Sequence, residues 1–180
     1  MNPETVVRVD RWWVGIATDG VAVRRIFLLD RSGAGGREPG PRPDISPLTA
    51  RAARWLAAWL DDPALPWPED LPLSPAPTPF QRRVRAELLA IPPGQTTTYG
   101  ALAKALGTAP RAVGGACRAN PVPLAVPCHR VVAASGIGGF SGESAGPWPA
   151  FKEWLLAREG AVCAGRQPSA LKPRRVIPIG

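Results

Sequence analysis

The sequence predicts an α+β protein, with a small N-terminal β-sheet domain carrying one helix and a mostly helical C-terminal domain containing a helix-turn-helix. Three observations support this prediction. β-rich apolar runs fill residues 5–29, a proline-rich stretch separates the two halves, and short capped helical patterns dominate the second half. We therefore expect a domain at residues 1–62, a linker at 63–79 and a second domain at 80–180.

The first domain begins with the β-rich runs, which Asp19-Gly20 interrupts. An Asp-Gly pair in such a place indicates a hairpin. Residues 31–47 hold several Gly and Pro and predict a loop. From Ser46, a candidate cap before Pro47, the apolar positions follow helical spacing. The positions expected to face the core are Leu48, Ala52, Trp55, Leu56, Trp59 and Leu60.

Seven prolines lie between residues 61 and 79. Proline lacks the N–H that a helix or a sheet ladder needs, so this stretch predicts a semi-rigid linker at the domain boundary. A helix follows from Phe80 to Ala90, and Pro92-Pro93-Gly94 ends it. Its inward-facing positions are expected to be Val84 and Leu88, with Phe80 and Leu89 beside them.

The next segment predicts two short helices joined by a tight turn. Thr98 can cap a helix over Tyr99–Leu106, Gly107 can end it, and Thr108 can cap a second helix with Pro110 in its first turn. Many DNA-binding proteins share this frame, and so do many proteins that bind no DNA.

The second of these helices has an unusual composition. Arg111 and Arg118 are seven residues apart and share one face, while Gly114 and Gly115 stand between them. A glycine costs about 1 kcal/mol in a helix interior relative to alanine, so two in succession indicate close approach of another backbone. That backbone belongs either to a neighbouring helix or to DNA.

The net charge of +8 is unevenly distributed. Residues 1–79 hold nine Arg and ten Asp or Glu, a net charge of −1, whereas residues 80–180 hold thirteen Lys or Arg and four Glu, a net charge of +9. A clustered basic surface favours nucleic acid, because binding releases condensed counterions. A generally arginine-rich composition would give the same numbers.

The composition argues against several classes of protein. With 180 residues and 45% hydrophobic content, the chain can bury a core. Its three cysteines and single histidine have no zinc-ligand spacing, so we expect neither a metal site nor a disulfide framework, and no cofactor. The sequence shows no signal-peptide pattern and no apolar run near the ~20 residues of a membrane helix. We expect a cytoplasmic monomer without a membrane partner.

The best-specified chemistry is a thiol in Pro127-Cys128-His129-Arg130, where His129 is the only histidine of the chain. A cysteine reacts as thiolate, and its free pKa of ~8.5 is lowered by a cation, an imidazole or a helix N-terminus. This motif offers candidates for all three, so we expect a lowered pKa for Cys128.

The motifs together resemble the O6-alkylguanine-DNA alkyltransferases, also called methylated-DNA–protein-cysteine methyltransferases. The resemblance covers about residues 78–160. It is highly specific because the motifs occur as an ordered set. These are Thr78-Pro-Phe-Gln81, Ile91-Pro-Pro-Gly94, Thr98-Tyr99-Gly100, Arg111-Ala-Val-Gly-Gly-Ala116, Asn120-Pro-Val-Pro123, Pro127-Cys-His-Arg-Val131, Gly139-Phe-Ser-Gly142 and Lys152-Glu-Trp-Leu-Leu156.

The resemblance implies a function and a set of roles. Cys128 would accept an alkyl group irreversibly from O6 of guanine, and possibly O4 of thymine, in double-stranded DNA. His129 would link to Cys128 through a water and be oriented by Glu153. The target base must leave the stack; Arg111 would fill the space it leaves, and Tyr99 would assist its rotation.

The remaining roles implied by the resemblance concern the DNA surface and the base pocket. The second helix, with Gly114 and Arg118, would face the minor groove, where sequence information is poor. Asn120 would be the hinge between this helix and the active-site turn. An ordinary turn-forming Asn before Pro is the other interpretation. The residues implied to line the base pocket are Pro123, Val131, Phe140 and Ser141. The N-terminal domain would be ribonuclease-H-like.

This chain departs from the family pattern in three places. Phe140 replaces the Tyr of many members, residues 143–150 are longer than the usual segment, and the basic tail at 165–180 has no counterpart. Cys117 and Cys163 match no motif and are expected to be structural.

Three rival functions differ in testable ways. An alkyltransferase-like protein binds the same lesion but lacks the acceptor cysteine. A Cys-His hydrolase would release its intermediate with water and turn over repeatedly. A helix-turn-helix regulator would prefer one fixed operator.

Overall fold

The computed structural model describes residues 2–29 and 45–161, so the predicted loop at 31–47 lies mostly outside the described residues, as do Cys163 and the basic tail. The chain divides into two units, one up to Ser74 and the other from Pro75. The α+β class expected from the sequence is confirmed, because each unit contains both helices and strands. No helix of the described segments is long and apolar enough to cross a membrane.

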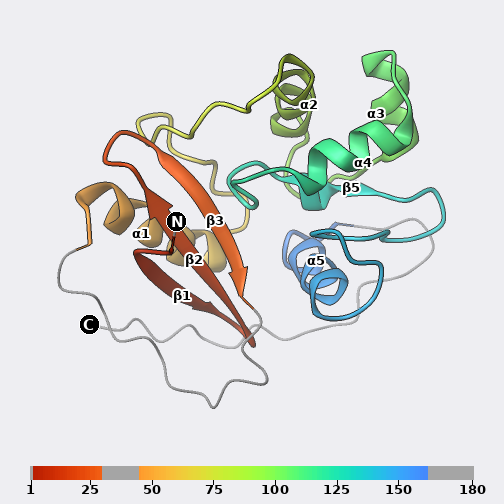
Figure 1. The fold of residues 1–180 in the computed structure, drawn as a ribbon. Coiled ribbons are helices and arrows are strands. Elements are labelled where there is room, and N and C mark those ends of the chain that lie inside the picture. The colour runs from red at the N-terminus through yellow and green to blue at the C-terminus, as the bar shows by residue number, and fades with distance from the viewer. Residues whose placement is uncertain (1, 30–44, 162–180) are drawn as a thin grey trace. The chain divides into compact units, whose positions relative to one another are not determined.

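The first unit contains a three-stranded antiparallel sheet in the order β1-β2-β3 (Figure 1). The strands are β1 (Thr5–Val9), β2 (Trp12–Thr18) and β3 (Val23–Leu29). The predicted hairpin joins β2 to β3, and the Asp19 carboxylate accepts hydrogen bonds from the amides of Val21 and Ala22. These side-chain bonds add to the backbone bond from the Asp19 amide to Ala22 O at 3.2 Å, which closes the turn.

Helix α1 (Pro47–Asp61) packs on this sheet. Ser46 caps it as predicted, because its hydroxyl oxygen accepts a hydrogen bond from the Thr49 amide at 3.1 Å. Of the six predicted core positions only Leu48 is not fully buried. The other five are Ala52, Trp55, Leu56, Trp59 and Leu60.

The proline-rich stretch is folded onto the first unit over much of its length. The Val23 amide donates to Pro72 O at 2.8 Å, and the Ser74 amide donates to Val23 O at 3.0 Å. Leu71 is buried, and the Trp55 indole donates to Pro66 O. The division between the units therefore falls inside the predicted linker, at Ser74, because apolar side chains between the prolines find partners on the sheet and on α1.

The second unit is mostly helical (Figure 1). Its elements are α2 (Pro79–Leu89), β4 (Thr97–Thr98), α3 (Tyr99–Leu106), α4 (Pro110–Arg118), the 3-10 turn η1 (Cys128–Arg130), β5 (Val131–Val132) and α5 (Pro147–Arg158). β4 and β5 form a two-stranded parallel pair, with Thr97 opposite Val131 and Thr98 opposite Val132.

Most helix ends in this unit follow the predicted capping chemistry. Thr78 and Gln81 form a reciprocal capping box at α2, Thr98 caps α3, and Gly107 ends α3 with φ 64°. Two predictions were wrong. Thr108 does not cap α4, because the cap position is Ala109, one residue later. Leu89 is 52% exposed, because the inward face of α2 is fully provided by Val84 and Leu88.

Candidate active site

The thiol lies on a tight turn that is fixed at both ends. Cys128, His129 and Arg130 form η1, and all three are buried. The Cys128 amide donates to Val126 O at 2.8 Å. Directly after η1, β5 pairs with β4, and β4 leads into Tyr99 at the start of α3. This pairing brings the predicted nucleophile and the predicted base-rotating tyrosine into one region of the unit.

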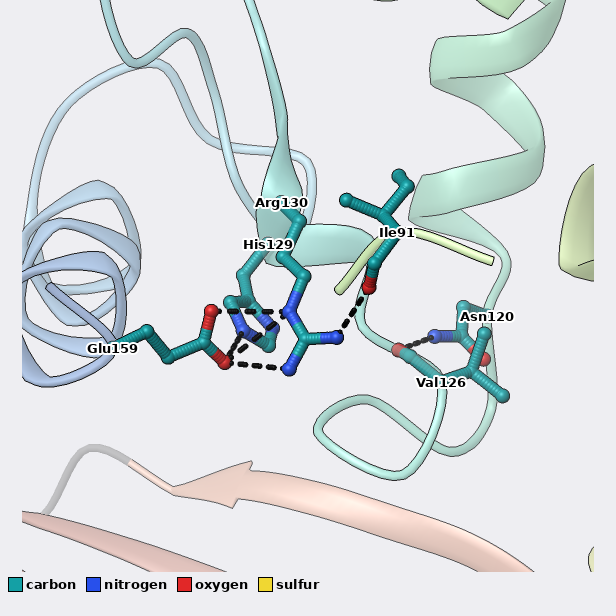
Figure 2. Close-up of polar contacts among 6 residues, drawn as sticks. All are labelled: Ile91, Asn120, Val126, His129, Arg130 and Glu159. Carbon is teal, nitrogen blue, oxygen red and sulfur yellow. Dashed lines mark hydrogen bonds and ion pairs between the residues drawn. The ribbon is translucent and has the colours of Figure 1, made fainter. Parts of the chain in front are cut away.

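Asn120 connects the end of α4 to the thiol turn. Its amide nitrogen donates to Val126 O at 3.0 Å and to Cys128 Sγ at 3.3 Å, and its amide oxygen accepts from the Val122 amide at 3.2 Å. Figure 2 shows the bond to Val126. One side chain thus holds the backbone at two points before the cysteine and contacts the sulfur itself.

A buried network of charged and polar groups surrounds His129 (Figure 2). His129 Nε2 lies 2.9 Å from Glu159 Oε1. Arg130 donates to both carboxylate oxygens of Glu159 at 2.8–3.2 Å and to Ile91 O at 2.6 Å. The Glu159 side chain is fully buried, and although burial raises its pKa, the bonds from His129 and Arg130 lower the pKa to about 2. Glu159 is therefore a carboxylate near neutral pH.

The expected partner of His129 was Glu153, and this prediction was wrong in position. Glu153 is an exposed residue of α5, whereas Glu159 follows the last residue of that helix and reaches His129. Six residues correspond to about 240° of rotation at 3.6 residues per turn, so the two carboxylates leave the helix in different directions. Gly160, with a φ of 68°, follows Glu159 and ends the helix, so a local signal marks the helix end but none identifies Glu159 as the partner of His129.

The imidazole of His129 is held in one tautomer by this network. Because Glu159 is ionised, Nε2 carries the hydrogen that bonds to it, and Nδ1 carries the lone pair. Nδ1 is buried and has no hydrogen-bond partner among the described residues. Burial lowers the pKa of His129, and the contact with Glu159 opposes this effect. The site therefore presents a neutral base next to a thiol in the sequence.

The pKa of Cys128 departs from the expected direction. We expected a lowered value, but burial raises the pKa of this thiol, while the Asn120 bond and the charge of Lys152 oppose the rise. The physical reason is that Cys128 is 4% exposed, and a dry site disfavours the charged form. The Cys128 side chain is therefore a neutral thiol near neutral pH, and it would have to lose its proton before it could act as a nucleophile.

Sequence reasoning assigned no role to Lys152, which is fully buried on α5. Its ammonium group donates to the carbonyl oxygens of Val131 at 2.6 Å, Ile137 at 2.8 Å and Gly139 at 3.2 Å. It also lies 5.5 Å from the centre of the Tyr99 ring. Lys152 thus orders the segment between β5 and the predicted pocket residues. The available signal was a lysine directly after Phe151 and three residues before Leu155, which is helical spacing for the same apolar face.

The four predicted pocket residues differ in their surroundings. Pro123 and Val131 are buried beside the thiol turn, and Ser141 is exposed. Phe140 packs against Phe151 with ring centres 6.4 Å apart, so its ring contributes to the core of this unit. Tyr99 is half-buried, and burial raises the pKa of its hydroxyl. Tyr99 is therefore a hydrogen-bond donor at neutral pH.

Packing against a neighbouring helix does not account for the two glycines of α4. An added Cβ at Gly114 or Gly115 would meet no heavy atom within 4 Å among the described residues. A packed neighbouring helix is therefore not the reason for either glycine. Arg111 and Arg118 are exposed on the same helix, so its surface combines positive charge with an accessible backbone. The described residues hold no cluster of His, Cys, Asp and Glu suited to a metal ion.

Residues 79–161 match the family model described as 6-O-methylguanine DNA methyltransferase, DNA binding domain. The chain is 43% identical over 136 residues to the methylated-DNA–protein-cysteine methyltransferase of Mus musculus, a match that covers 70% of this chain and 59% of that protein. With the Cricetulus griseus protein of the same name it is 41% identical over 140 residues, which cover 72% of this chain and 63% of that protein. The chain thus spans about three fifths of the length of these relatives.

Two solved structures extend the similarity to nearly the whole chain. The Mycobacterium tuberculosis OGT in complex with DNA is 29% identical, with a TM-score of 0.68, and the match covers 87% of this chain and 91% of that one. The O6-methylguanine-DNA methyltransferase of Pyrococcus kodakaraensis is 31% identical, with a TM-score of 0.53, and the match covers 87% and 97% of the two chains.

Proposed function

Because this chain belongs to the O6-methylguanine-DNA methyltransferase family, we propose that it repairs DNA by transferring an alkyl group from O6 of guanine to Cys128. The observation that carries this proposal is the arrangement around the thiol. Asn120 bonds to the sulfur, and the neighbouring His129 is a neutral base whose far nitrogen faces an ionised carboxylate. A nucleophile, a base and an orienting acid are the parts that such a transfer requires.

The proposed step moves one proton and one alkyl group. His129 Nδ1 takes the proton of Cys128, through a water as the family resemblance implies, and the imidazolium is stabilised by Glu159. The sulfur attacks the alkyl carbon, an S–C bond forms, and the C–O bond breaks with its electrons remaining on guanine. Guanine leaves as a neutral base by accepting a proton from the Tyr99 hydroxyl, and the proton that His129 took from the thiol returns through solvent to Tyr99, so that the net transfer is one proton from sulfur to guanine. The thioether has no route back to a thiol, so each molecule reacts once.

Tyr99 is the proposed donor to the departing guanine. Its raised pKa keeps the hydroxyl protonated, and its ring lies against Gly138 and near Lys152. Phe140 has no hydroxyl to offer, so in this chain the donors are Tyr99 and backbone amides. The proposed pocket walls are Pro123 and Val131, with Ser141 at the open side.

The proposed DNA-binding element is the pair α3 and α4, used as a helix-turn-helix. The two helices contact each other and are joined by residues 107–109. The accessible backbone at Gly114 and Gly115 would lie against sugar-phosphate, and Arg118 would contact a phosphate. Arg111 would fill the space left by the rotated nucleotide. Asn120 would hold α4 against the thiol turn as the hinge.

A lesion-binding protein that transfers nothing is the nearest competing function, and the intact Cys128 with its base argues against it. One experiment separates the two. Incubation with a duplex oligonucleotide containing O6-methylguanine should add one methyl group to the intact mass, and peptide mapping should place it on Cys128. A parallel reaction with O4-methylthymine defines the second substrate. Tight lesion binding without a mass change would establish the competing function instead.

A further inference from the structure

The tight turn at residues 140–143 carries Ser141 and adjoins the thiol site through Lys152. The amide of Phe140 donates to Glu143 O at 2.8 Å, and the amide of Glu143 donates to Phe140 O at 3.0 Å. Its two central residues have positive φ, 52° at Ser141 and 91° at Gly142. Both angles are those of a type I′ turn. Serine is strained at such an angle, so contacts outside the turn must help to hold it.

One such contact comes from α4. The side chain of Arg118 lies across Gly142: an added Cβ at Gly142 would be 2.8 Å from Nε, 3.2 Å from Cζ and 3.4 Å from Cδ of Arg118. Position 142 therefore favours glycine for two separate reasons. Its positive φ suits glycine, and the Arg118 side chain occupies the space that a larger side chain at this position would need. Arg118 is the last residue of α4, the helix proposed to lie on DNA.

We propose that Arg118 is a positioning residue for the 140–143 turn as well as a DNA contact, so that one side chain links the DNA-binding helix to the wall of the base pocket. The pocket role rests on the proposed function. The support of the turn rests on the contact with Gly142 alone and applies to the free protein.

The chemistry of arginine suits both tasks. Its aliphatic stem and the flat face of its guanidinium cover the Gly142 backbone, while its N–H groups remain available for phosphate oxygens. Methionine at this position would keep much of the apolar cover and lose the charge. Lysine would keep the charge and lose the flat face. The two tasks are therefore separable by substitution.

The first test measures amide hydrogen exchange of Phe140 and Glu143 in the free protein. Arg118→Ala should speed their exchange on the order of tenfold, the change expected from losing one or two packed methylene groups. Arg118→Met should stay near the wild-type rate. Lys104→Ala, which removes a positive charge from the exposed end of α3, is the matched control and should change nothing at the turn. Unchanged exchange in Arg118→Ala would overturn the proposal.

The second test measures alkyl transfer to Cys128 from free O6-benzylguanine and from duplex DNA containing O6-methylguanine. Arg118→Ala should slow both reactions, whereas Arg118→Met should restore the reaction with the free base and leave the duplex reaction slow. Loss confined to the duplex in both variants would make Arg118 a phosphate contact only and overturn the proposal. A wild-type protein that transfers nothing from either substrate would overturn the proposed function, while the exchange result would still decide the support of the turn.

Discussion

Among the described residues, each unit holds a carboxylate that accepts several hydrogen bonds, half-buried at Glu4 in the first unit and fully buried at Glu159 in the second, and the two sets of bonds have different uses. In the first unit, Glu4 accepts from the Thr18 amide at 2.8 Å and from the hydroxyls of Thr18 at 3.0 Å and Thr49 at 2.6 Å. In the second unit, Glu159 accepts from His129 and Arg130. Burial alone would raise the pKa of both carboxyls, and in both units the hydrogen bonds lower it instead.

The difference lies in what the donors can do. The donors to Glu4 are hydroxyls and an amide, which do not titrate near neutral pH, so this cluster ties the chain before β1 to β2 and to the start of α1. The donors to Glu159 include an imidazole beside a thiol. A carboxylate whose pKa is lowered by hydrogen bonds is therefore no sign of chemistry by itself. The sign is a titratable donor whose other nitrogen is buried without a hydrogen-bond partner among the described residues.

The largest expected effect tests whether alkyl transfer by the second unit depends on the sulfur of Cys128. Cys128→Ala or Cys128→Ser should abolish methyl transfer, because the nucleophile is gone, while binding to a duplex with O6-methylguanine persists on the untouched α4 surface. Intact mass and a gel-shift titration measure the two properties. Residual transfer in the alanine variant would refute the assignment of Cys128.

The direct comparison of the two carboxylates uses Glu159→Gln and Glu4→Gln. Glu159→Gln should slow transfer roughly 10²–10³-fold, as expected when a base loses the group that supports its charged form. It should also reduce the free energy of unfolding by about 3 kcal/mol, because Arg130 is left without a buried counter-charge. Glu4→Gln should cost about 1 kcal/mol of stability and leave the transfer rate unchanged. Equal rate losses in both variants would remove the distinction between the two clusters.

Arg111 tests whether the exposed α4 surface works separately from the buried site. Arg111→Ala should slow reaction with duplex DNA much more than reaction with free O6-benzylguanine, since only the duplex requires extrusion of a base at a cost of a few kcal/mol. Single-turnover rates on both substrates provide the measurement. Equal losses would instead place Arg111 among the supports of the fold.

The smallest expected effect is a pH dependence of stability that originates in the second unit. The pKa of His129 is lowered in the folded state, so below its unfolded value of about 6.5 the unfolded chain binds a proton that the folded chain does not. Stability should therefore fall as pH decreases from 7 to 5, by up to about 1.4 kcal/mol per pH unit. Chemical denaturation across this range measures the slope. His129→Gln should flatten it, and an equal slope in that variant would point to another group.

Local patterns predicted most of the elements, because they depend on neighbours in the chain. The caps at Ser46, Thr78 and Thr98 follow from a hydroxyl and the amide three residues later, and Gly107 follows from its freedom at positive φ. The thiol motif was predicted from consecutive residues. Such features need no knowledge of the tertiary fold.

The errors concern contacts between distant segments. His129 and Glu159 are thirty residues apart, and nothing in the local sequence distinguishes the reach of Glu159 from that of Glu153. Burial of Cys128 raises a pKa that its neighbours in sequence were expected to lower. Lys152 bonds to three carbonyls on a segment 13–21 residues earlier in the chain. Each depends on packing, which a single sequence does not specify.

The way the proline-rich stretch returns to β3 determines how the protein should be dissected. Val23 bonds to both Pro72 and Ser74, and the Trp67 indole donates to Leu71 O within the same stretch. A cut at residue 63 would remove these partners from the first unit. It would also leave Trp67 and Leu71 as exposed apolar residues at the start of the second fragment. A cut between Ser74 and Pro75 leaves both sets of contacts whole, and it is the boundary at which separate expression of each unit should give soluble material.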